Sequence, residues 1–161
     1  CLFRINRDIR FSKDKSPYKT NFGMSIAKKG KKGISAGYYL HCEPGHSFIG
    51  GGLWMPMAPD LNKVRQEIDY CWDEFKKILI SKKFKSTFGE LKKDEGMGLS
   101  RPPKGYNDDN PAIEYLKLKH FIATKPLADK DFQTKELVKN VVNTFQILQP
   151  LLNFINRSIE G

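Results

Sequence analysis

The clearest regular pattern in the chain is the helical spacing of apolar residues in two long segments. Over residues 59–80, apolar side chains recur every three or four positions, which predicts an amphipathic helix opened by a Pro-Asp pair. A second segment with the same spacing follows Thr134, which we expect to cap a helix over residues 134–159. Pro150 is expected to kink or divide that helix. Both apolar stripes predict packing into a core.

Alternation of apolar and polar residues predicts strands elsewhere. Residues 1–11 have the period-two pattern of a half-buried strand, but Arg7 falls on its apolar face. An unpaired buried charge costs several kcal/mol, so Arg7 is expected to form an ion pair, for example with Asp8, or to bind a ligand anion. Further along, a helical turn over residues 111–116 is expected before a strand over residues 117–124.

A hairpin is predicted from residues 34–43 and 47–55, because both segments resemble strands and a Pro-Gly turn joins them. Side chains alternate across a strand, so the residues of this hairpin divide between two faces. One face is expected to carry the aromatic and polar side chains Tyr39, His41, Glu43, Phe48 and Trp54. Three consecutive glycines, residues 50–52, are explained either by a bulge or by close approach of a ligand or another backbone.

The remaining segments are polar and contain the residues typical of loops. They include residues 12–23, a cationic tip at 27–33, and a long irregular stretch over 81–110. The chain has 161 residues, the usual size of one domain. We therefore expect a single α+β domain over residues 1–161, with a mostly antiparallel sheet and two main helices packed on it.

The charge and cysteine content narrow the classes of partner and compartment. The formal net charge is +10, from 28 Lys and Arg against 18 Asp and Glu. Such a balance favours anionic partners, although lysines spread along a chain also serve solubility alone. No apolar run approaches the roughly 20 residues of a membrane span, so no membrane partner is expected. Three cysteines without a CxxC pair favour a reducing compartment, and hence a cytoplasmic protein.

Cationic side chains form the main candidate site. We expect side chains near the start of the chain to meet those of the long middle loop around a hollow floored by glycine. There they would bind a phosphate- or carboxylate-bearing small molecule. The candidate binding residues are Arg4, Arg7, Arg10, Lys15, Lys19, Tyr39, Arg101, Lys104 and Tyr106. His41 and Glu43, on the same strand face as Tyr39, are the candidate catalytic pair for proton transfer.

A metal site is the competing interpretation of the same histidine. His41, Glu43 and His120 have the composition of a two-histidine, one-carboxylate iron site. The two strand residues share a face, but nothing in the sequence brings His120 to them. No metal ligand is therefore assigned, any cofactor is left unknown, and enzymatic activity is left open.

Two other functions compete with binding of an anionic small molecule. The first is a nucleic-acid-binding module, in which lysine-rich loops contact phosphates and Tyr18 and Tyr106 stack on bases. The second is a structural or assembly role. In that case a second copy of the chain, forming a homodimer, or N-terminal helices absent from this sequence would cover exposed apolar surface.

Several stretches of the chain resemble one family, the uncharacterised bacterial group catalogued as domain of unknown function 2461. They are Arg4–Gly23, Gly37–Gly45, Gly50–Pro56, Arg101–Tyr106 and Asp109–Phe121. The resemblance implies an α+β fold and no particular reaction. Family members carry about sixty further residues ahead of the position of Cys1. The resemblance therefore also implies that this chain is the C-terminal part of a longer protein.

Overall fold

One antiparallel sheet forms the centre of the molecule. The computed structural model describes residues 2–4, 6, 10, 15–30, 33–93, 96 and 98–160. Within them, four strands pair in the order β1-β2-β3-β4, each antiparallel to its neighbour. The strands are β1 (Phe22–Ala27), β2 (Gly37–Cys42), β3 (Phe48–Leu53) and β4 (Phe121–Pro126). The predicted α+β class and the predicted hairpin of β2 and β3 are both confirmed.

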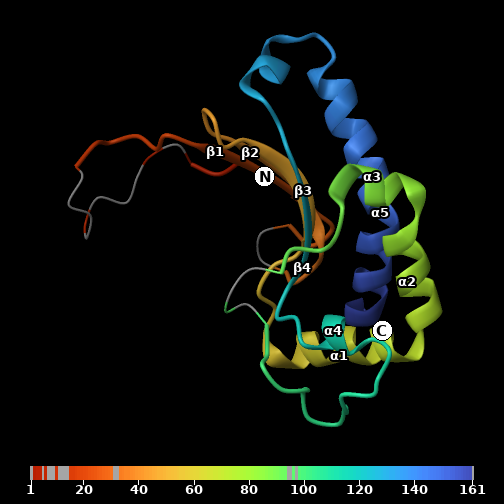
Figure 1. Cartoon of the computed structure of the whole chain (residues 1–161). Helices are drawn as coiled ribbons and strands as arrows, with labels where there is room; N and C mark the ends of the chain where they lie inside the picture. Colours follow the sequence, from red (N-terminus) through yellow and green to blue (C-terminus); the bar gives the residue numbers. More distant parts are fainter. Residues whose placement is uncertain are drawn as a thin grey trace.

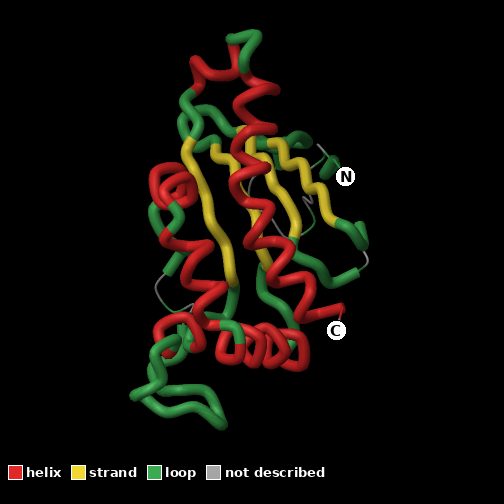
Figure 2. Tube along the Cα trace, turned by 90° about the vertical axis from the view of Figure 1, so that its right-hand side faces the viewer, coloured by secondary structure: helices red, strands yellow, loops and turns green. Residues whose placement is uncertain are grey.

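The helices gather on one side of this sheet. They are α1 (Ala58–Tyr70), α2 (Trp72–Ile80), α3 (Lys82–Phe88), α4 (Ile113–Leu116), the 3-10 helix η1 (Asp129–Gln133) and α5 (Leu137–Glu160). In Figure 1, α5 and α2 lie beside one face of the sheet, and α1 and α4 lie across its lower end. Figure 2 shows α5 running along the front of the strands. The opposite face of the sheet carries no helix of the described chain.

The core lies between α5 and the sheet and continues between the helices. The ring of Tyr38 on β2 packs on Phe145 of α5, with centroids 4.6 Å apart. Further along α5, the fully buried Phe154 packs against Phe75 of α2 at 5.2 Å. The apolar stripes predicted from the helical spacing are therefore core, except near the start of α5, where Val138 and Val142 of the predicted stripe are exposed.

Two helical predictions need correction. The segment over residues 59–80 is two helices, because the chain changes direction at Cys71 between α1 and α2. Both halves keep their apolar stripe toward the core, so the spacing alone does not mark the break. The last helix begins at Leu137 rather than after a cap at Thr134, and it continues through Pro150 to Glu160. It is the longest described helix, yet neither it nor any other described helix has the length and apolar character needed to cross a bilayer.

Other elements lie where the sequence showed only loop. In strand β1, sequence FGMSIA, the large apolar residues Phe22, Met24 and Ile26 alternate with small ones, and the strand pairs with β2 along its whole length. Helix α3 lies inside the long segment over 81–110, where the Ser81 hydroxyl caps it by accepting a hydrogen bond from the Phe84 N–H. The predicted helical turn before β4 is confirmed as α4.

Arg7 and more than half of the predicted strand over residues 1–11 lie outside the described residues. Of its described residues, Leu2 forms an isolated antiparallel bridge with Met24 of β1. Asn6 forms another with Tyr18. The start of the chain thus reaches the outer edge of β1.

The three consecutive glycines belong to β3 and allow very close strand packing. The register of β3 with both neighbours is continuous, so the bulge interpretation is wrong. A Cβ on Gly50 or Gly52 would overlap the backbone carbonyl oxygens of β4, and Gly52 has a φ of +136°. Close approach of another backbone is therefore the confirmed explanation. A consequence is that the middle of the open sheet face lacks side chains.

Candidate functional site

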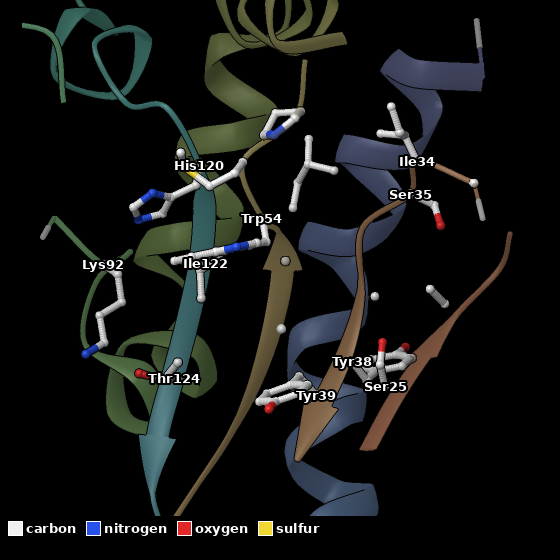
Figure 3. Close-up of a pocket in the computed structure, with 18 of the residues that line it drawn as sticks. Ser25, Ile34, Ser35, Tyr38, Tyr39, Trp54, Lys92, His120, Ile122 and Thr124 are labelled. Carbon is white, nitrogen blue, oxygen red and sulfur yellow. The ribbon is translucent and has the colours of Figure 1, made fainter. Parts of the chain in front are cut away.

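A cavity of about 780 Å³ lies on the open face of the sheet. Its floor includes Gly37, Gly51 and Gly52, and Gly37 and Gly52 lie opposite each other on this face without side chains. Figure 3 shows Tyr39 toward one end of the cavity and Trp54 with His120 at the other. The two rings at the far end pack together with centroids 5.4 Å apart, and the His120 side chain is fully buried.

The sides of the cavity come from segments far apart in the sequence. Ile122 and Thr124 of β4 line one side together with Lys92, which precedes β4 by some thirty positions in the chain. Ile34 and Ser35, which precede β2, line the other side. Most of this lining is apolar or aromatic, with a few polar groups at defined positions. That composition is typical of sites for small organic molecules.

A chain of hydrogen bonds runs along the open face of β2. The Tyr39 hydroxyl lies 3.2 Å from Nδ1 of His41, and Nε2 of His41 lies 3.0 Å from a carboxylate oxygen of Glu43. The imidazole also stacks on Phe48 of β3, with centroids 4.9 Å apart and planes 17° apart. Tyr39 lines the cavity, whereas His41 and Glu43 do not. The predicted grouping of these side chains on one strand face is confirmed.

Local backbone structure positions both ends of this hydrogen-bond chain, Glu43 and Tyr39. Glu43 opens the turn to β3, where its N–H donates to the Ser47 hydroxyl and that hydroxyl donates to the Glu43 carbonyl. At the other end, Gly23 of β1 leaves room for the phenol. A Cβ there would stand 2.7 Å from the Tyr39 hydroxyl oxygen. Glycine at position 23 is therefore a positioning feature that the sequence did not reveal.

Burial sets the protonation state of the phenol. Desolvation raises the pKa of Tyr39 above its ordinary value, and the neighbouring Cys42 thiol raises this pKa further. The phenol therefore keeps its proton at neutral pH. In that form it can donate one hydrogen bond and accept others.

The predicted cationic site is not assembled. The described residues near the start of the chain, Arg4, Arg10, Lys15 and Lys19, are exposed and precede β1. The loop that carries the exposed Arg101 and Lys104 lies beside α1 and α4 (Figure 1). The cavity lining includes none of these six residues.

The sheet register explains this separation. The start of β1 pairs with the end of β2, whereas the start of β4 pairs with the end of β3. The segments that precede β1 and β4 therefore leave opposite ends of the sheet. The expectation that both cationic groups share the glycine-floored hollow is wrong for the described residues, and Arg7 lies outside them.

Tyr106, the aromatic member of the predicted set, is part of the helical core. It is half-buried and packs against the core cluster. Burial raises the pKa of its phenol, Asp69 raises it further, and Arg65 opposes them. This side chain is therefore placed to support the loop over 99–110 rather than to face the cavity.

The competing metal triad is also separated in space. His120 lies against Trp54 at the end of the cavity away from Tyr39, the residue to which His41 is bonded. Within the part of the chain that the structure describes, no three His, Cys, Asp or Glu side chains are grouped closely enough to hold a metal ion.

Several lining residues were not among the sequence candidates. Alternation along β4 places Ile122 and Thr124 on one face and the buried Phe121 and Ala123 on the other. That pattern was available in the sequence, but only the pairing of β3 with β4 shows which face meets the cavity. No sequence pattern identified Lys92 as a lining residue, since it lies in an irregular segment.

Comparison with known proteins places the chain in a family. A family model described as "Conserved hypothetical protein (DUF2461)" matches residues 1–154. The chain belongs to this family. No curated protein and no solved structure matches the chain. The resemblance inferred from the sequence is confirmed.

Proposed function

We propose that this DUF2461 protein binds a small organic acid with a flat apolar body in the cavity on the open sheet face. The observation that carries the proposal is the form of that cavity. Its glycine floor lies between aromatic rings, with Tyr39 and Phe48 toward one end and Trp54 at the other. A flat ring can lie on a floor without side chains and contact aromatic groups at its edges.

Lys92 supports the choice of an acid. Its backbone N–H donates to the carbonyl of Ile122 at 2.8 Å, which ties this segment to the exposed edge of β4. The lysine side chain therefore stands at the cavity rim, where an ammonium group attracts a carboxylate or phosphate. The net charge of +10 adds a general attraction for anions.

The test compares a charged and an uncharged ring compound. Isothermal titration calorimetry with 2-naphthoate and 2-naphthamide measures both affinities in the wild type and in Lys92→Met. We expect the wild type to prefer 2-naphthoate by about five- to tenfold, the worth of one charge-assisted contact at a partly exposed site. Lys92→Met should lose that preference and keep its affinity for 2-naphthamide.

Lys93→Met is the matched control. Lys93 is the adjacent exposed lysine, it lies 3.9 Å from Glu90, and it does not line the cavity. Its removal should leave both affinities unchanged. A second variant, Thr124→Trp, places a large side chain in the cavity and should abolish binding of both compounds. Equal loss in the two lysine variants, or unchanged binding in Thr124→Trp, would contradict the proposal.

Nucleic-acid binding is supported by one separate observation. Tyr18 is 62 % exposed, and the exposed Lys15 and Lys19 lie in the same segment. An exposed aromatic ring among lysines suits stacking on a base. The other stacking candidate, Tyr106, packs against the core instead.

A further inference from the structure

We infer that Tyr39 exchanges a proton with the ligand in the cavity, and that His41 and Glu43 carry this proton to and from solvent. This inference rests on the proposed function, since it concerns the same cavity and the same organic acid. It adds a reaction class, which is acid–base chemistry at an O–H group of the ligand. The ligand would then be an organic acid that also carries a phenol or enol hydroxyl.

The hydrogen-bond partners fix the direction of the chain. A carboxylate only accepts hydrogen bonds, so the 3.0 Å contact with Glu43 requires the proton of His41 on Nε2. In the neutral ring Nδ1 is then an acceptor, and the Tyr39 hydroxyl donates to it over 3.2 Å. The lone pairs of the Tyr39 oxygen are left to accept a hydrogen bond from a ligand in the cavity.

One transfer along this chain balances without any further reactant. The ligand O–H bond breaks and its proton moves to the Tyr39 oxygen, while the original Tyr39 proton moves to Nδ1 of His41. Tyr39 is neutral before and after, the ligand leaves the step as an oxyanion, and His41 becomes an imidazolium. Glu43 stabilises that imidazolium by accepting the hydrogen bond from Nε2.

The partial exposure of His41 and Glu43 gives the proton a route from the hydrogen-bond chain to water. The His41 side chain is 15 % exposed, and the Glu43 side chain is 30 % exposed. Tyr39 faces the cavity, so the three groups lead from the cavity to the protein surface. Stacking on Phe48 holds the imidazole in the orientation that both hydrogen bonds require. Tyr39 is thus the catalytic residue of the inference, and His41 and Glu43 position and relay the proton.

The first experiment uses 4-nitrophenol, whose absorbance reports whether it is ionised. Equilibrium dialysis measures its binding, and absorbance measures its ionised fraction when bound, at a pH below its own pKa in water. We expect the ratio of ionised to neutral probe to be about tenfold higher bound than free. The methyl ether 4-nitroanisole, which has no proton to give, controls for solvent effects on the spectrum.

Variants assign the effect to the relay. Tyr39→Phe and His41→Phe keep the aromatic packing and should bind 4-nitrophenol in its neutral form. Gly23→Ala adds a methyl group against the Tyr39 hydroxyl, which can swing aside, so it should fold and also lose the ionisation. Lys92→Met tests whether the rim charge alone ionises the probe. Bound probe that stays neutral in the wild type, or ionised in Tyr39→Phe, overturns the relay.

A measurement without any ligand keeps the two proposals apart. The ¹⁵N chemical shifts of the His41 ring in the wild-type protein report its neutral tautomer. We expect the Nε2–H form, and the Nδ1–H form would overturn the relay even if the cavity binds acids. If 4-nitrophenol and 2-naphthoate both fail to bind, the proposed function falls, and the tautomer still decides the direction of the hydrogen-bond chain.

Discussion

At the residue scale, Gly52 shows how backbone constraint creates the candidate site. Its φ of +136° is rarely adopted by residues with side chains, and a Cβ there would overlap the carbonyl oxygen of Phe121. A larger residue would therefore push β3 away from β4. The same absence of a side chain leaves the hollow above the sheet. One residue thus serves strand packing and the cavity together.

Replacing Gly52 should be far more damaging than replacing a glycine that needs only its backbone angle. We expect Gly52→Ala to lower the free energy of unfolding by more than about 3 kcal/mol, because it adds a backbone overlap to the conformational strain. Gly45→Ala is the control, since Gly45 also has a positive φ but nothing lies near its added Cβ. It should cost about 1 kcal/mol.

Urea unfolding followed by circular dichroism measures both free energies. Similar losses in the two variants would show that the strand approach at Gly52 relaxes easily. In that case the cavity floor would not depend on glycine. From the sequence, this triplet is explained either by a bulge or by close approach of a ligand or another backbone.

At the element scale, two arginines join the helices in different environments. Arg65 of α1 is 6 % exposed, and its guanidinium donates to the carbonyls of Leu116 at 2.7 Å and Leu118 at 3.2 Å. Burial lowers the pKa of Arg65, and Tyr106 partly restores it. These bonds hold the end of α4 and the approach to β4 against α1.

Arg157 of α5 also joins helices, but it lies at the surface. It bonds Glu74 of α2 through two nitrogens and Glu67 of α1 through Nε at 2.9 Å. Those hydrogen bonds, with Glu74 first and then Glu67, raise the pKa of Arg157 above its ordinary value. Its side chain is 51 % exposed, so solvent screens the pairs.

The two arginines should therefore differ in their contribution to stability. Arg65→Met leaves two buried carbonyls without their donors and should cost about 2–4 kcal/mol. Arg157→Met removes exposed ion pairs and should cost about 1 kcal/mol or less. Thermal and urea unfolding of both variants give the comparison. A larger loss for Arg157 would mean that the helices are held mainly by the surface network.

Sequence patterns were most informative about elements whose signals are local. The three-and-four spacing predicted the buried stripe of α1 and α2 and most of that of α5, because a helix face depends only on nearby residues. Val138 and Val142 of the predicted α5 stripe are exposed. The spacing missed the break at Cys71, since both helices bury the same stripe. The sequence analysis assigned no strand to β1, because the residues around it are typical of loops, although large apolar and small residues alternate along it.

At the scale of the whole molecule, the positive charge is not focused on the cavity. The described cations near the start of the chain and those of the 99–110 loop belong to segments that join opposite ends of the sheet, and none of them lines the cavity. Lys92 alone among the described Lys and Arg residues lines the cavity. Nucleic-acid binding by the exposed lysines and arginines would therefore not depend on the cavity.

Nucleic-acid binding predicts a steep dependence on salt. Fluorescence anisotropy with labelled oligo(dT) should give micromolar affinity at low salt, and phosphate contacts predict a large loss as salt is raised. Tyr18→Ala should weaken binding by about 1 kcal/mol or more if the ring stacks on a base. Tyr70→Ala is the matched control, because Tyr70 is 82 % exposed on α1. Absence of binding at low salt, or equal effects of both substitutions, would rule this function out.

Features that depend only on neighbouring positions could be predicted from the amino-acid sequence. Period-two alternation placed Tyr39, His41 and Glu43 on one face, and the glycine triplet indicated either a bulge or a close approach. Only the tertiary structure decided which distant segments complete the site. Strand order and register brought Lys92 and Thr124 to the cavity and sent the loop of Arg101 to the other end of the sheet from the N-terminal cations. The β2–β3 hairpin follows from a local turn, but pairing between strands far apart in the sequence, such as β3 with β4, is set by the packing of the whole chain.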